Sequence, residues 1–206
     1  MTTLTELSIK YNTDKNPNDH NYISLYEQWF GRSNVQSMLE IGLGSGASHR
    51  MWLEYFPQAK IYGIEYFGEE NKNTWNNFDG NIPGLNLICG SSTDPETWNQ
   101  IPYGLDIIID DGSHEIDNQI ATFELGFSKL KSKGLWIIED CHCGFEKKYG
   151  ASDRLYQYFM NLIIGQQLPN FPTGGDFYKY RQYMTGFSKD IFSYNFYKSL
   201  IVMIKA

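Results

Sequence analysis

Cysteine is scarce in this sequence, and its scarcity excludes a disulfide-rich fold. The chain has 206 residues and three cysteines, Cys89, Cys141 and Cys143. An odd number cannot be paired completely within one chain, and two of the three stand only one residue apart. Such usage is typical of proteins from a reducing compartment.

Long hydrophobic runs are also missing, which argues against membrane-spanning helices. No run approaches the ~18 apolar residues that such a helix needs. The first residues include Glu6 and Lys10 and have no apolar stretch of the kind found in signal peptides. We therefore predict a cytoplasmic protein that has no membrane partner.

Positive charge is in short supply as well. Lys and Arg together number 17 and Asp and Glu number 24, which gives a net charge of −7. Proteins that bind nucleic acid through its phosphates present a basic face, so we expect no nucleic-acid partner. An acidic chain suits a small neutral acceptor or a divalent cation. The composition leaves open whether the chain forms a homo-oligomer.

Hydrophobic residues, in contrast, are plentiful enough to build a core. They make up 41% of the chain, so disorder is not expected. Five short apolar runs bounded by turn residues predict buried strands, because polar alternation is weak and β-branched residues are frequent. These runs are residues 36–41, 60–65, 84–89, 105–110 and 134–140.

Helix-like segments separate these runs. In residues 115–131 apolar side chains recur at spacings of three and four, as on one face of a helix. Further helices are expected over residues 46–56, 68–78 and 153–167. The succession of strand, helix and strand predicts right-handed crossovers and parallel pairing. Residues 188–194 and 197–206, separated by two residues, predict an antiparallel hairpin.

Together these elements predict an α/β fold. We expect a doubly wound, mostly parallel, seven-stranded sheet with a C-terminal antiparallel hairpin. One domain is expected over residues 1–206, with a Rossmann-like core over residues 31–206. The polar, turn-rich residues 1–30 are expected to form a lid or substrate segment. The proline- and glycine-containing residues 168–183 form a long loop without an assigned role.

A glycine-rich turn follows the first predicted strand and opens a helix. Gly42, Gly44 and Gly46 allow a tight turn and a close approach of a ligand to the backbone. At the switch point of a doubly wound sheet, such a turn binds a nucleotide-like cofactor. The next strand ends at Glu65, whose carboxylate can accept hydrogen bonds from both hydroxyls of a ribose.

Two cofactor classes fit this turn. Gly42, Gly44 and Ala47 meet the dinucleotide fingerprint, which would indicate NAD(P). Taken together with Glu40, the same turn resembles motif I of the class I S-adenosylmethionine methyltransferases, and the C-terminal hairpin resembles the last strands of their fold. The predicted cofactor contacts are Glu40, Gly42, Gly44, Gly46, Glu65, Ser91, Ser92 and Asp110.

Two acidic pairs mark a second site. Asp110 and Asp111 end the fourth predicted strand, and Glu139 and Asp140 end the fifth. The C-terminal ends of parallel strands share one edge of a sheet, so these acids should converge. Carboxylates that close repel each other unless a cation lies among them, and oxygen ligands favour a hard ion such as Mg²⁺. His114, on the same edge, is a candidate general base.

A more specific resemblance rests on this second site. DDGSH at 110–114, followed by GLWIIEDCH at 134–142, resembles the metal-dependent sugar O-methyltransferases of the macrocin and mycinamicin type and the related cephalosporin hydroxylase-like family. Residues 13–22 also resemble a segment that precedes motif I in these proteins. The resemblance implies methyl transfer from S-adenosylmethionine to a hydroxyl of a small-molecule or sugar acceptor. It implies that Asp111, Glu139 and Asp140 hold Mg²⁺ and that His114 is the base.

Weaker predictions concern the acceptor and a second kind of metal. His20, Tyr22 and His142 are expected to line the acceptor pocket. The run from Cys141 to Cys143 leaves open a zinc site, although a tetrahedral site needs further ligands.

Three other functions stay open. The first is a catechol-type O-methyltransferase, whose fold has an Asp-Asn pair where this chain has Glu139 and Asp140. The second is an NAD(P)-dependent oxidoreductase, and the third is a non-catalytic partner that keeps the fold without turnover.

Overall fold

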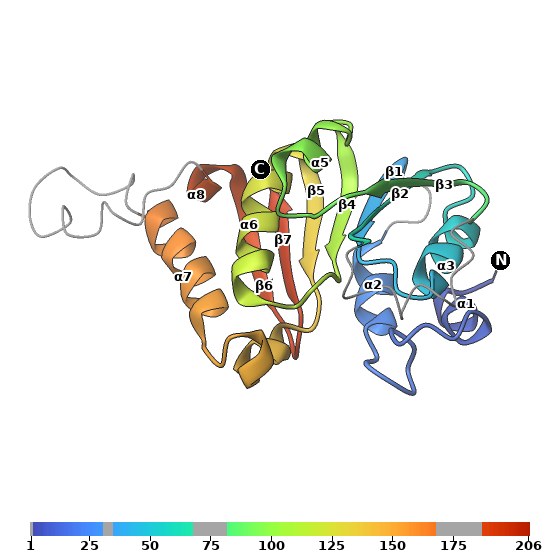
Figure 1. Ribbon diagram of the computed structural model, residues 1–206, viewed down its shortest axis with the longest axis horizontal. Helices are drawn as coiled ribbons and strands as arrows, with labels where there is room; N and C mark the ends of the chain where they lie inside the picture. The colour runs from blue at the N-terminus through green and yellow to red at the C-terminus, as the bar shows by residue number, and fades with distance from the viewer. Residues whose placement is uncertain (1, 31–34, 68–81, 168–186) are drawn as a thin grey trace, which may run out of the picture.

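The sheet predicted from the sequence is the centre of the molecule. The computed structural model describes residues 2–30, 35–67, 82–167 and 187–206. Within these residues, seven strands form one sheet in the order β3-β2-β1-β4-β5-β7-β6 (Figure 1). The strands are β1 (Ser37–Ile41), β2 (Lys60–Glu65), β3 (Leu85–Cys89), β4 (Leu105–Asp110), β5 (Leu130–Ile138), β6 (Ile191–Phe196) and β7 (Ile201–Lys205).

Strand pairing confirms the predicted fold class. Strands β1 to β5 pair in parallel, whereas β7 runs antiparallel to β5 and β6 runs antiparallel to β7. From β1 the chain proceeds to β2 and β3 on one side and then crosses to β4 on the other. The end of β1 is therefore the switch point at which doubly wound folds bind ligands.

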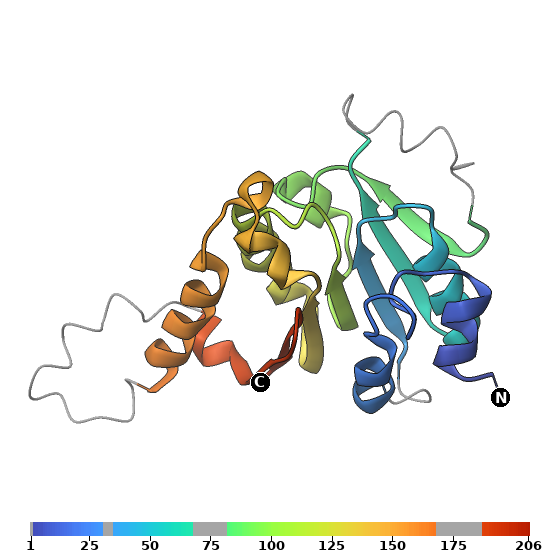
Figure 2. The same ribbon diagram turned by 90° about the horizontal axis from the view of Figure 1, so that it is seen from below.

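Helices cover both faces of the sheet. The described α-helices are α1 (Leu4–Lys10), α2 (Ile23–Trp29), α3 (Ala47–Tyr55), α5 (Pro95–Asn99), α6 (Ile116–Gly126), α7 (Arg154–Gln167) and α8 (Phe187–Asp190). Because neighbouring strand residues face opposite sides, Ile108 packs in the core beneath α6 and α7, and Ile107 in the core beneath α1 to α3. Figures 1 and 2 show the blue and cyan helices α1 to α3 on one flank and the orange helix α7 on the other.

The N-terminal segment differs from its prediction. Residues 1–30 were expected to be a polar lid or substrate segment, but they contain α1 and α2. A capping box starts α1, in which the Thr3 hydroxyl accepts from the amide of Glu6 and the Glu6 carboxylate accepts from the amide of Thr3. Leu7 and Tyr26 are fully buried. The two helices therefore contribute to the core, and the expectation that this segment contacts a substrate stays a prediction.

Three predicted boundaries in the second half of the chain were wrong. The helix expected over 115–131 ends at Gly126, and β5 begins at Leu130, before the expected start of the strand. Leu130 pairs with Leu105, and a register shift follows at the polar residues 131–133, so the strand has no continuous apolar run from its start. In the hairpin Phe196 pairs with Ile201, so the connection has four residues, 197–200, instead of two. Ser199 adopts the positive φ that this turn requires.

Two predictions lie outside the described residues, namely the helix over 68–78 and the loop over 168–183. In the described part of the chain, no helix combines the length and the apolar character needed to cross a bilayer. The predictions of a cytoplasmic location and of a homo-oligomer stay predictions.

Candidate active site

The glycine turn after β1 has a backbone that other residues adopt only with strain. Gly42, Gly44 and Gly46 have φ values of +90°, +50° and +74°. A Cβ atom on Gly42 would lie 2.0 Å from the carbonyl oxygen of Asp111. The absence of a side chain at Gly42 therefore lets the turn lie directly against the end of β4.

A cavity of about 760 Å³ opens beside this turn. Of the predicted cofactor residues, five line it: Gly42, Gly44, Glu65, Ser91 and Ser92. The carboxylate of Glu65 accepts from the amides of Leu43 (2.6 Å) and Tyr66 (2.8 Å), so it also holds the turn in place. Burial raises the pKa of Glu65. The volume lies within the range of small-molecule sites.

The remaining predicted cofactor residues, Glu40, Gly46 and Asp110, do not line this cavity. Glu40 is fully buried, and its Oε2 accepts from the Ser48 hydroxyl and the Trp52 indole, each at 2.9 Å. Burial also raises the pKa of Asp110 to about 7. Their placement gives no support to direct cofactor contact, because each lies behind the cavity wall instead of in it.

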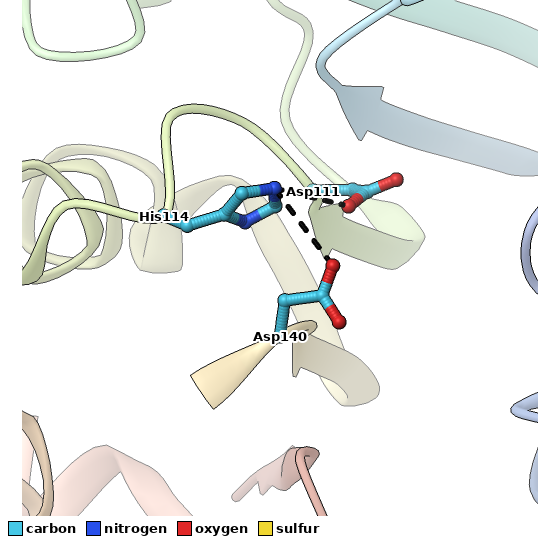
Figure 3. A group of neighbouring side chains, drawn as sticks. All are labelled: Asp111, His114 and Asp140. Atoms are coloured by element: carbon cyan, nitrogen blue, oxygen red, sulfur yellow. Dashed lines mark ion pairs between the residues drawn. The ribbon is translucent and has the colours of Figure 1, made fainter. Parts of the chain in front are cut away.

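A group of three side chains meets at the ends of β4 and β5, as Figure 3 shows. His114 Nε2 lies 4.0 Å from Asp111 Oδ1 and 3.8 Å from Asp140 Oδ2. One ligand atom from each of the three lies within 4.8 Å of the others. Asp111 and His114 also line the cavity. The chain thus places oxygen ligands and an imidazole at the end of a cofactor-sized cavity.

His114 lies in a partly buried environment that favours its neutral form. Its ring packs edge-on against Tyr149, and its Nδ1 is buried without a hydrogen-bond partner in the described residues. Burial lowers the pKa of His114, and the charge of Asp140 opposes this only in part. A lowered pKa keeps the imidazole neutral near pH 7, and the neutral form is the one that acts as a base.

Glu139 lies on the other side of Asp111. Its Oε1 accepts from the Tyr26 hydroxyl, and its Oε2 accepts from Lys15 Nζ at 2.9 Å. The same ammonium lies 2.5 Å from Asp111 Oδ2. The three acids predicted to hold a metal therefore do not form one group: Asp111 belongs to one group with Asp140 and to another with Glu139.

The physical cause is the path of the backbone after β5. Asp140 has a φ of +52°, in the left-handed region, so the chain turns sharply at this residue. Neighbouring residues at the end of a strand also face opposite sides, so Glu139 and Asp140 are directed to different sides of Asp111 although they are adjacent in sequence.

The acidic cluster has less positive charge than negative charge. Burial raises the pKa of Asp111 to about 7 even though Lys15 lowers it, and burial with the charge of Asp111 raises the pKa of Glu139 well above its usual value. Burial would lower the pKa of Lys15, but the three carboxylates around it raise it well above its usual value. One ammonium does not balance these acids, so the residues present fit a further cation.

The predicted acceptor residues gather around Asp140. Its Oδ1 accepts from the Tyr22 hydroxyl at 2.5 Å and lies 3.3 Å from His20 Nδ1 and 3.9 Å from His142 Nδ1. These three side chains do not line the cavity beside the glycine turn. Their expected contact with an acceptor stays a prediction. The structure places all three next to Asp140.

A zinc site formed by the cysteines has no support. No metal-capable group found among the described side chains contains a cysteine. Cys141 is buried, and its thiol donates to the carbonyl of Ile138 at 3.5 Å. Burial raises the pKa values of both Cys141 and Cys143, which disfavours the thiolate that binds zinc.

Sequence reasoning missed several site residues, and those that contact the acids come from the N-terminal segment. Lys15 and Tyr26 contact the acids, and the residues of 12–14 line the cavity. From the sequence, residues 13–22 show only a resemblance to a segment that precedes motif I in the related family. A lysine in a polar turn has no local signature of burial, so its distant partners become visible only in the folded chain.

The chain is similar to several known O-methyltransferases over part of their length. No family model matches it. It is 30% identical over 161 residues to the 8-demethyl-8-(2-methoxy-alpha-L-rhamnosyl)-tetracenomycin-C 3'-O-methyltransferase of Streptomyces olivaceus, across 72% of this chain and 39% of the relative. It is 29% identical over 191 residues to the mycinamicin VI 2''-O-methyltransferase of Micromonospora griseorubida, across 82% of this chain and 46% of the relative. The chain therefore spans less than half the length of these curated relatives.

A solved structure agrees with these relatives. The MycE methyltransferase from the mycinamycin biosynthetic pathway, in complex with Mg and SAH, matches with a TM-score of 0.82 and 26% sequence identity. The match covers 100% of this chain and 55% of MycE. In sequence and in fold, the chain is related to the S-adenosylmethionine-dependent sugar O-methyltransferases, as its DDGSH and ED motifs predicted.

Proposed function

We propose that the chain is a magnesium-dependent O-methyltransferase that methylates a hydroxyl of a sugar or of another glycosylated small molecule. One observation carries the proposal: a single cavity runs from the glycine turn and Glu65 to Asp111 and His114. A cofactor site and an acid–base site therefore share one space. The relatives, named for O-methylation of sugars on natural products, support this acceptor class.

The cofactor half of the cavity fits S-adenosylmethionine, which would supply an activated methyl group. Gly42 and Gly44 let the backbone approach the ligand closely, and Glu65 can accept from ribose hydroxyls. Ser91 and Ser92 line the same cavity beyond Glu65 and are proposed to lie near the adenine. Glu40 and Asp110 are proposed to support this half from behind its wall.

The metal half fits a hard divalent cation. Such a cation would stabilise the negative charge that develops on the acceptor oxygen. We propose Asp111 and Asp140 as its ligands, because these carboxylates lie together at the end of the cavity. Glu139, which the resemblance implies as a third ligand, lies on the other side of Asp111, so we propose it as a partner of Lys15 and Tyr26 and not as a ligand of this ion.

His114 is proposed to take the proton of the acceptor hydroxyl at Nε2. This atom is the one directed toward Asp111 and Asp140, whereas Nδ1 is buried. Because its pKa is lowered, the ring is already neutral and can take up a proton directly. Tyr22, His20 and His142, which surround Asp140, are proposed to orient the acceptor.

The proposal is tested with purified protein, labelled S-adenosylmethionine and a panel of acceptors. The panel contains deoxysugar glycosides, free sugars and catechols. We expect turnover on a glycoside, loss of turnover in EDTA and recovery with Mg²⁺. Turnover that survives EDTA would exclude the metal role, and turnover on catechols alone would assign the catechol-type activity. Stabilisation by NAD(P) but not by S-adenosylhomocysteine in thermal unfolding would assign the oxidoreductase.

A further inference from the structure

Lys15 is the most deeply buried charge that the proposed mechanism does not use. It is 1% exposed, although it belongs to a polar loop between α1 and α2. Its Nζ lies 2.5 Å from Asp111 Oδ2, 2.9 Å from Glu139 Oε2 and 3.3 Å from Glu40 Oε1. A single ammonium thus contacts carboxylates from the ends of three neighbouring strands.

These three oxygen-bearing residues also satisfy the geometry of a cation site. One carboxylate oxygen from each of Glu40, Asp111 and Glu139 lies within 4.8 Å of the others. Glu40 Oε1 is buried without a hydrogen-bond partner in the described chain, and it is the oxygen directed at Lys15. The opposite oxygen of Glu40 is held by Ser48 and Trp52. Glu40 therefore presents a fixed, otherwise unpaired oxygen to the position of the ammonium.

We propose that the acidic cluster is built for two cations and that Lys15 is one of them, carried by the chain itself. The ammonium occupies the position between Glu40, Asp111 and Glu139. The exchangeable divalent ion occupies the other side of Asp111, beside Asp140 and His114. The inference rests on the proposed metal-dependent function for this second ion only. The place of Lys15 follows from its own contacts.

A tethered cation has a consequence that a second free ion would not have. The carbonyl of Lys15 accepts from the amides of Tyr22 (3.1 Å) and Ile23 (3.3 Å), at the start of α2. The preceding residues, 12–14, line the cavity. Lys15 therefore fixes one wall of the cavity to the ends of the strands, and we assign it as a positioning residue for Asp111 and Glu139.

The test counts Mn²⁺ ions bound per chain, by equilibrium dialysis with electron paramagnetic resonance of the free ion. Lys15→Ala opens the position of the ammonium and keeps all the acids. Lys15→Met fills the same space with an uncharged group. Lys129→Ala is the matched control, because Lys129 is also buried but donates to the carbonyl of Ile101 and lies over the ring of Tyr103. Each is compared with the wild-type chain.

We expect Lys15→Ala to bind one more Mn²⁺ than the wild type, and Lys129→Ala and Lys15→Met to bind no additional ion. Without metal, Lys15→Ala should unfold about 10 °C lower than the wild type, since a buried ion pair has lost one partner. Saturating MnCl₂ should restore most of this loss in Lys15→Ala and little of it in Lys15→Met. Unfolding curves thus test the idea even if the variant is weakly folded without metal.

The outcomes separate this inference from the proposed function. An unchanged ion count in Lys15→Ala, or equal rescue of Lys15→Ala and Lys15→Met by MnCl₂, overturns the role of Lys15. If the wild type binds no Mn²⁺, the metal-dependent function fails. In that case a single ion gained by Lys15→Ala still supports the inference, and no ion gained overturns it.

Discussion

The two sides of Asp111 differ in their access to solvent and therefore to ligands. On one side, His114 and Asp111 line a cavity, and their side chains are 20% and 17% exposed. On the other side, Lys15, Glu40 and Glu139 are each at most 1% exposed. The same carboxylate thus has one face toward an open site and one face toward a closed ionic core. Ligands can enter on the open side only.

This difference explains how so many acids coexist at one edge of a sheet. On the closed side the compensating charge and donors come from the chain, through Lys15 and the Tyr26 hydroxyl. On the open side, within the part of the chain that the structure describes, the carboxylate of Asp140 meets the Tyr22 hydroxyl and histidines, which leaves its charge available for an added cation. In the proposed function, the closed side holds the site in shape and the open side takes part in the reaction. The following predictions test this division, from the largest expected effect to the smallest.

The largest effect is expected for Asp111→Asn, because Asp111 belongs to both sides. Loss of this charge weakens the metal site and leaves Lys15 with fewer partners. We expect kcat/KM to fall roughly 10³-fold or more, since a metal stabilises a transition state by several kcal/mol. Calorimetry with S-adenosylhomocysteine is the control, and its affinity should change little. Wild-type activity in this variant would contradict the division.

A smaller loss is expected for His114→Asn, which alters the open side alone. General-base catalysis contributes about 10²–10⁴-fold, and kcat should fall by that order. Mn²⁺ affinity and thermal stability should stay close to those of the wild type. A variant that loses metal binding along with turnover would show that His114 is a ligand instead of a base.

The pH dependence should report the same histidine. Burial lowers the pKa of His114 below 6.5, so the ring is neutral at pH 7 and gains a proton only in more acidic solution. Activity should therefore be level near neutrality and fall as the pH drops through that lowered pKa. The assay uses saturating Mg²⁺, because the pKa of Asp111 is raised to about 7 without metal. If the acidic limb persisted in His114→Asn, another group would be responsible for it.

The cofactor half should respond to Glu65→Gln without a change in metal binding. The amide cannot accept on both of its atoms, so it disturbs the bonds from Leu43 and Tyr66 and weakens any bond to a ribose. We expect S-adenosylhomocysteine to bind about tenfold more weakly, a change of about 1.4 kcal/mol. Titration calorimetry measures this directly, and an unaltered affinity would place the ribose elsewhere.

The smallest effect on turnover is expected for Tyr26→Phe, on the closed side. The variant removes the hydroxyl that donates to Glu139 and leaves a buried acceptor oxygen without its partner. The free energy of unfolding should fall by about 2 kcal/mol, which is the usual cost of leaving a buried acceptor without its partner. The value of kcat should change less than about threefold, because the residue lies on the closed side. Chemical denaturation and a parallel assay measure the two. A large loss of turnover at wild-type stability would mean that the closed side also takes part in the reaction.

The sequence was sufficient to predict those parts of the site that depend on residues close together in the chain. The parallel strands and the antiparallel C-terminal hairpin followed from short apolar runs, and the glycine turn from Gly42 and Gly44. His114 and Asp111 are three residues apart, so their proximity could be predicted once β4 was placed. Each of these depends on interactions within a few residues or on the rule that parallel strands end at one edge.

Long-range choices within the same site were not predictable. Glu139 was expected to share a metal with Asp140, but in the structure it accepts from Lys15 and Tyr26, which lie more than a hundred residues earlier in the chain. Glu40 was expected to contact a cofactor, but the Trp52 indole and the Ser48 hydroxyl of α3 hold it behind the wall. Such outcomes are decided by which side chains are nearby once the core has packed.

By itself, the sequence determined a parallel sheet with a glycine turn, two acidic strand ends and a histidine beside them. Periodicity and turn chemistry act over short stretches, which is why these features are visible in the letters alone. Only the tertiary structure decided that Lys15, more than ninety residues before Asp111, divides the acids into a closed side and an open side. The physical reason is that a buried ammonium is stable only among carboxylates, and folding brings those carboxylates together from three separate strands.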